Sequence, residues 1–233
     1  MSEQASPSSE ADLGPQEREG TIELLGAIAY GAISGFTRMA ADSEMARDLV
    51  LKRALAGMAV KEFHNHELLV DHVVELGGDP IEAMAPFRAA FDSFHARTRP
   101  RDLLEGMVKA YIGDGIATDF FLEISRYVEP TTRAIIERAS SDHRDVDTIV
   151  AAVRAGISED SRRSGPLALW GRRLVGEALT QGQVVASERD ALSELVLGLN
   201  HDRPGATLEE VGELMQRLTD RHQSRMGRLG LAA

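Results

Sequence analysis

The stretch LKRALAGMAVKEFHNHELLVDHVVEL, residues 51–76, decides the fold of this chain. Its large apolar side chains recur every three or four residues, at Leu55, Met58, Leu69 and Val73, which is the spacing of one face of an α-helix. The periodic pattern begins near residue 43 and stops at a Gly-Gly-Asp-Pro sequence, a typical end of a helix. It therefore predicts a helix of about 34 residues, on the order of 50 Å long.

Periodic stretches on both sides of this segment predict further helices. Asp42 and Ser43 offer side-chain oxygens that could cap the start of the long helix. After its end, residues 80–99 lack a long hydrophobic period, which suggests short helices that cross between the long ones. Alternating strand patterns are absent from the sequence. The other expected helices are Thr21–Ala41, Asp102–Val128, Thr132–Ala139, Val146–Glu159, Ser164–Leu199 and a last one that runs from a capping box at Thr207 to Gly230. Long helices bury most area lengthwise, so the chain is predicted to be an all-α antiparallel bundle.

Composition limits both the organisation and the chemistry. Residues 1–16 are rich in Ser, Glu and Pro and are expected to be a disordered tail, followed by a bundle over 17–199 and a C-terminal capping helix within 200–233. The absence of cysteine excludes disulfides and thiolate chemistry. A formal net charge of -11 disfavours binding to DNA or anionic lipid. No apolar run approaches the roughly 20 residues of a membrane span, and the start lacks a signal-peptide pattern, so we expect a cytoplasmic protein.

Three long helices each carry an acidic residue in the middle of the apolar face. These residues are Glu62, Asp114 and Glu177. Burying an unpaired carboxylate costs several kcal/mol, so the three require a shared cation, basic partners or raised pKa values. The alternative interpretation is that small rotations of the helices let each acid reach solvent or pair with Lys61, Lys109, Arg172 or Arg173.

Three short blocks resemble a known family. The blocks are EFHNHE at 62–67, AYIGD at 110–114 and GEALTQ at 176–181, and they are similar to the metal-binding helices of ferritin-like carboxylate proteins. The nearest branch is MiaE-like, similar to a tRNA hydroxylase that oxidises an isopentenyl-type adenosine with a di-iron centre. The resemblance covers roughly Thr21 to Leu199. It implies a ferritin-like fold and, if hydroxylase activity is retained, tRNA as a partner.

The ligand pattern of that family is only partly present. The resemblance implies a Glu on the first helix, Glu-x-x-His on the second, Glu on the third and Glu-x-x-His on the fourth. The matching positions hold Ala32, Glu62, Asn65, Asp114, Glu177 and Thr180. Three of the six expected ligands are therefore missing, which argues against a standard di-iron centre.

His66 offers a replacement ligand, because it lies one helical turn after Glu62. Glu62, His66, Asp114 and Glu177 could then bind a single iron. Equally, His66 could join a hydrogen-bonded network that contains no metal. Two functions follow, a metal-dependent hydroxylase and a non-catalytic structural or regulatory protein, either of which could be a homodimer.

Two further groups of residues have ordinary explanations. Arg162, Arg163, Arg172 and Arg173 form a basic cluster that could hold phosphate, but nearby acids favour ion pairing instead. His64 and His72 are eight residues apart without a partner histidine, and we expect both at solvated or rim positions.

Overall fold

The computed structural model describes residues 13–141, 145–198 and 205–233. Within these residues the chain is helical and contains no β-strand. The α-helices are α1 (Pro15–Met45), α2 (Leu49–Glu75), α3 (Pro80–Met84), α4 (Arg88–Arg97), α5 (Leu103–Ile124), α6 (Pro130–Ala139), α7 (Val146–Glu159), α8 (Ser164–Glu188), α9 (Asp190–Leu197) and α10 (Leu208–Leu229). Short 3-10 turns cover Ala85–Phe87, Ser125–Tyr127 and Ser161–Arg163. The predicted all-α bundle is confirmed.

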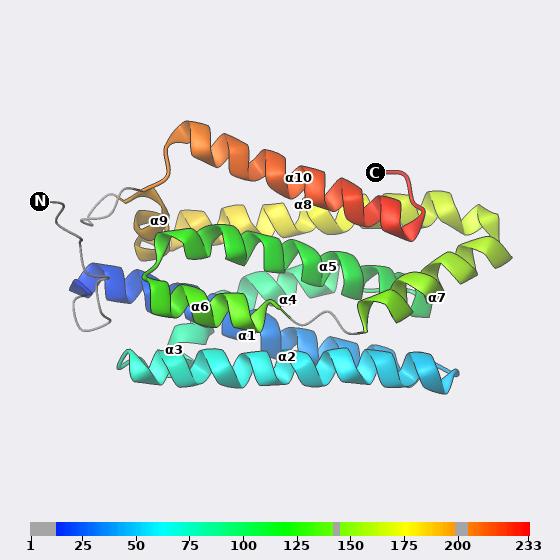
Figure 1. Cartoon of the computed structure of the whole chain (residues 1–233), viewed down its shortest axis with the longest axis horizontal. Coiled ribbons are helices and arrows are strands. Elements are labelled where there is room, and N and C mark those ends of the chain that lie inside the picture. Colours follow the sequence, from blue (N-terminus) through cyan, green and yellow to red (C-terminus); the bar gives the residue numbers. More distant parts are fainter. Residues whose placement is uncertain (1–12, 142–144, 199–204) are drawn as a thin grey trace, which may run out of the picture.

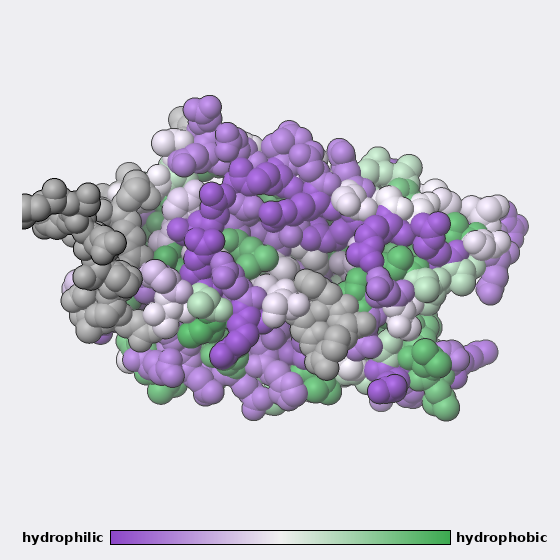
Figure 2. Space-filling view, in the orientation of Figure 1, coloured by the Kyte–Doolittle hydropathy of each residue, from purple (hydrophilic) through white to green (hydrophobic). Residues whose placement is uncertain are grey.

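The long helices lie lengthwise against one another (Figure 1). A short connection joins α1 to α2, which therefore pack as an antiparallel pair. After α5, the chain returns along the bundle through α6 and α7, so α5 and α8 run in the same direction. The last helix, α10, packs on α5 and α7 and presents a hydrophilic outer surface (Figures 1 and 2).

Local capping explains several helix ends. Asp102 accepts a hydrogen bond from the Glu105 backbone N–H at 3.0 Å, which caps α5. At α10, Thr207 and Glu210 form the reciprocal capping box that the sequence indicated. Gly230 ends this helix with φ of 75°, a backbone conformation that favours glycine.

Two predicted helix boundaries are wrong. The helix expected from about residue 43 is shorter than predicted. Its first residues belong to α1, which continues to Met45, and α2 itself begins at Leu49 and has 27 residues. Asp42 is buried inside α1, and Asp48 caps α2 by accepting from the Leu51 N–H at 2.9 Å. The expected helix from Ser164 to Leu199 is also divided, since α8 ends at Glu188.

The proposed disordered tail lies mainly outside the described residues. Where it is described, Leu13 is 7% exposed and belongs to the core, and α1 begins at Pro15, six residues before the expected start. One described helix, α1, is long and apolar enough to cross a membrane by length and composition. Half of its most apolar window is buried in the bundle, as in the core helix of a soluble protein, so this feature assigns no location.

The buried apolar side chains form two separate clusters along the bundle. One contains Met39, Leu55, Ala59 and Ile112, among others. The other contains Leu24, Leu69, Phe87 and Ile124, among others. Within the described chain, neither cluster includes a buried residue of α2 between Ala59 and Leu69 or of α5 between Ile112 and Ile124. We call this interval the waist.

Candidate functional site

Glu62 lies at the waist, on the part of α2 that packs on α1. Glu62 is only 9% exposed, and its side chain lies beside Gly35 of α1. Burial, together with the smaller effect of the nearby Asp114 carboxylate, raises the pKa of Glu62 to about 8. Lys61 opposes this shift, with its Nζ 3.6 Å from Glu62 Oε1. Glu62 is therefore a buried carboxyl group with a half-buried carboxylate, Asp114, and one lysine near it.

His66 lies one turn further along α2. Its Nδ1 is 3.0 Å from the Ala29 carbonyl oxygen, so Nδ1 carries the proton and donates it to that oxygen. This contact fixes the tautomer in which Nε2 is unprotonated. A histidine held in this way is a common arrangement for a metal ligand, and it is also a common way to satisfy a partly buried histidine.

Glu177 has a different environment on α8. Its carboxylate lies 4.0 Å from the Arg97 guanidinium, and its side chain is 20% exposed. Among the described residues, no group of three or more His, Asp or Glu side chains is arranged to hold a metal ion. The structure thus places Glu62 beside Asp114, whereas Glu177 faces a basic partner from α4.

Two positions that hold ligands in the family pattern carry other side chains here. Ala32 is buried in α1 and offers no ligand atom. Thr180 is exposed, and its hydroxyl donates to the Gly176 carbonyl oxygen of its own helix at 2.8 Å. The side chains at these positions therefore do not fit a di-iron centre, which needs carboxylate or imidazole ligands from four helices.

A second polar cluster near the waist was not predicted. Lys109 is 8% exposed, and its Nζ donates to the Thr98 carbonyl oxygen at 2.7 Å. Burial lowers the pKa of Lys109 to about 8, an effect that Asp42 opposes. Beside them, burial lowers the pKa of His95 to about 3, which keeps it neutral. The sequence offered Lys109 as a possible partner of Glu62, Asp114 or Glu177, but it donates to Thr98 and its nearby acid is Asp42.

The remaining sequence expectations have mixed outcomes. His64 is exposed as expected, but the prediction for His72 is wrong, because it is 1% exposed. His72 joins α2 to α6 through Thr132 Oγ1, at 2.7 Å from its Nε2. Arg162 pairs with Asp160 as expected.

The chain matches a family model described as a ferritin-like domain of actinomycetes, over residues 15–199. The match covers most of the chain, which therefore belongs to this family of ferritin-like proteins. No curated protein is significantly similar to it in sequence.

Proposed function

We propose that this protein is a non-catalytic, structural or regulatory member of the ferritin-like fold, in which the Glu62–Asp114 pair holds a proton instead of two iron ions. The observation that carries the proposal is the isolation of this pair. Glu177 lies near Arg97, at 4.0 Å, and the positions of Ala32 and Thr180 supply no carboxylate or imidazole ligand. The buried Glu62 carboxyl group retains a proton near neutral pH, because burial and the neighbouring Asp114 carboxylate both disfavour its ionised form.

Iron loading tests this proposal. Untagged protein is incubated anaerobically with excess Fe(II), desalted and analysed for iron per chain. We expect less than one bound iron and no absorption band of an oxo-bridged iron pair after exposure to air. Two retained irons per chain, lost in Glu62→Gln and kept in Glu67→Gln, would overturn the proposal. Glu67 is a suitable control because it is exposed on the same helix.

The second candidate is a metal-dependent hydroxylase that resembles the tRNA-modifying enzymes. The tautomer of His66 favours it, because Nε2 is left free to bind a metal while Nδ1 is held by Ala29. Glu62, His66 and Asp114 would then hold one iron, and Glu177 would join them after releasing Arg97. One iron per chain in the loading experiment, lost in His66→Ala, would favour this candidate over the first.

The partners and location follow from these proposals. tRNA is a partner only of the hydroxylase, and a homodimer is compatible with both candidates. The net charge of -11 supports our expectation of a cytoplasmic protein that binds neither DNA nor membranes.

A further inference from the structure

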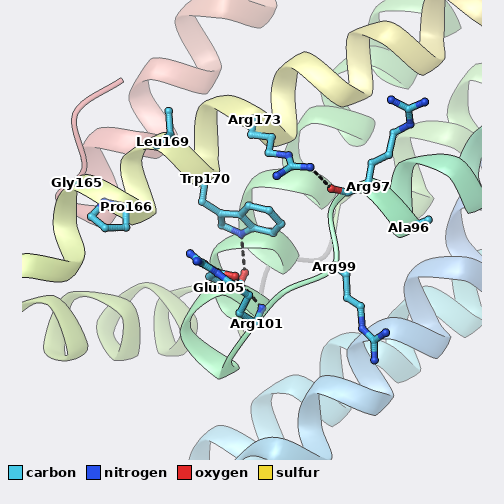
Figure 3. A pocket seen from close by; sticks show the side chains of 10 residues that line it. All are labelled: Ala96, Arg97, Arg99, Arg101, Glu105, Gly165, Pro166, Leu169, Trp170 and Arg173. Carbon is cyan, nitrogen blue, oxygen red and sulfur yellow. Dashed lines mark hydrogen bonds and ion pairs between the residues drawn. The ribbon is translucent and has the colours of Figure 1, made fainter.

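A cleft of about 670 Å³ lies between the start of α8 and the segment that joins α4 to α5. Its volume is in the range of small-molecule sites. Pro166, Leu169 and Trp170 form an apolar wall on α8. Trp170 is fixed by a hydrogen bond from its Nε1 to the Glu105 carbonyl oxygen at 3.1 Å (Figure 3).

The charged lining of this cleft is basic, although the protein is acidic. Four arginines line it against a single carboxylate, that of Glu105. Arg101 neutralises this carboxylate through its Nε, at 2.8 Å from Oε1. The other lining arginines, Arg97, Arg99 and Arg173, therefore leave an excess of positive charge in a chain whose formal net charge is -11.

Only some of the guanidinium N–H groups of these arginines donate hydrogen bonds within the protein. Arg173 donates one hydrogen bond, to the Arg97 carbonyl oxygen at 2.7 Å, and its guanidinium lies 6.0 Å from the centre of the Trp170 ring. Arg97 has only a long contact with Glu177, at 4.0 Å. Arg99 is exposed and has no ion pair within the described part of the chain. Arg173 lies beside the indole and Arg101 beside Glu105, whereas the heads of Arg97 and Arg99 point away from the indole (Figure 3).

We propose that this cleft binds a small amphipathic anion, a phosphate or carboxylate group carried on a planar apolar body. The apolar body packs on Pro166, on the exposed Leu169 and on the edge of Trp170, which is otherwise buried, and the anionic group accepts hydrogen bonds from Arg173 and from Arg99 once Arg99 has turned toward the cleft. The site is independent of the Glu62–Asp114 pair, because its lining comes from α8 and from the α4–α5 segment.

Trp170 is the only tryptophan in the chain, so its fluorescence reports directly on this cleft. The full chain is titrated with phenyl phosphate, inorganic phosphate and phenol. We expect a saturable response to phenyl phosphate that weakens with added salt, and binding of the other two that is about tenfold weaker or more. Equal binding of phenol would overturn the role of the charge, and equal binding of inorganic phosphate would overturn the role of the apolar wall.

Two arginine variants locate the anionic group. Arg99→Gln should weaken phenyl phosphate binding about tenfold, since one charge-assisted contact is lost. Arg88→Gln is the matched control, because Arg88 is an exposed arginine of α4 outside the cleft. Arg173→Gln provides a second variant at the indole. Equal affinities of Arg99→Gln, Arg173→Gln and the control would overturn the assignment, as would tight binding of a short RNA with no response to phenyl phosphate.

Discussion

At the scale of single residues, Glu62 carries an electrostatic cost. Its carboxyl group is buried at the waist beside the half-buried Asp114, and within the described chain Lys61 is the cation that lowers its pKa. Lys61 Nζ, 3.6 Å from Glu62 Oε1, only partly offsets burial and the second carboxylate, because the pKa of Glu62 remains raised. Protonation of Glu62 removes the like-charge repulsion and most of the desolvation cost.

Glu62→Gln should change how stability depends on pH. The folded pKa of Glu62, about 8, lies above its unfolded value of 4.5, so the native state binds the proton more tightly. Stability is therefore fully present below pH 4.5 and is lost as pH rises to about 8. The amide removes this loss, so the variant should match the wild type near pH 5 and exceed it by on the order of 3 kcal/mol near pH 8.5.

Urea denaturation at the two pH values measures this effect. Glu67→Gln, a change of the same chemistry at an exposed position of α2, should keep the pH dependence of the wild type. Parallel pH profiles of Glu62→Gln and the wild type would show that Glu62 is ionised throughout.

At the scale of helices, α1 depends on close approach to its neighbours. A Cβ on Gly26 would lie 2.2 Å from the Ala83 carbonyl oxygen of α3, which is main chain and cannot move aside easily. A Cβ on Gly35 would meet only the Glu62 side chain, at 3.5 Å or more. Identical substitutions at the two glycines should therefore have opposite consequences.

Gly26→Ala should destabilise the protein by about 2 kcal/mol or more, because α3 must shift away from α1. Gly35→Ala should be neutral or stabilising by up to about 1 kcal/mol, because alanine is the better helix former. Chemical denaturation of both variants measures the difference. Equal free energies of unfolding would mean that α1 and α3 are not packed as closely as described.

The docking of α10 also depends on specific side chains. Glu123 of α5 is 4% exposed and accepts from Arg217 Nη2 at 2.9 Å. Burial raises the pKa of Glu123, but the hydrogen bonds from Arg217 and Arg126 outweigh this effect and hold the pKa below its usual value. Asp119, one turn earlier, pairs with Arg225 at 2.5 Å. These contacts hold a helix whose outer surface is hydrophilic.

Glu123→Gln should loosen α10, because the buried partner of Arg217 loses its charge. We expect faster amide hydrogen exchange over Leu208–Leu229, with an opening free energy lower by about 1–2 kcal/mol. Glu213→Gln is the control, since Glu213 also contacts Arg217 but is 61% exposed. Equal exchange in both variants would show that apolar packing alone retains α10.

At the scale of the whole molecule, helices were predictable where their signals are local. The caps at Asp102 and Thr207 act within one turn, so sequence alone indicated where α5 and α10 begin. The break between α8 and α9 has a distant cause. Glu23 of α1 pairs with Arg189 and accepts from the Leu192 N–H at 3.1 Å, and no local pattern contains that contact.

The candidate site was predictable to a similar extent. The apolar stripe of α2 correctly indicated that Glu62 is buried. The partner of Glu177 could not be predicted, because Arg97 belongs to a separate crossing helix. The basic cleft was also missed, since Arg99 and Arg101 lie in a connection without periodicity and line one cleft with Trp170 only in the folded chain.

The most direct test of the central claim is the pKa of Glu62, measured from the carboxyl ¹³C chemical shift as pH is varied. The burial of Glu62 beside Asp114 predicts a midpoint of about 8, which Asp114→Asn should lower because a like charge is removed. A midpoint near 4.5 in wild-type protein, unchanged in Asp114→Asn, would contradict the claim that Glu62 holds a proton at a buried site beside Asp114.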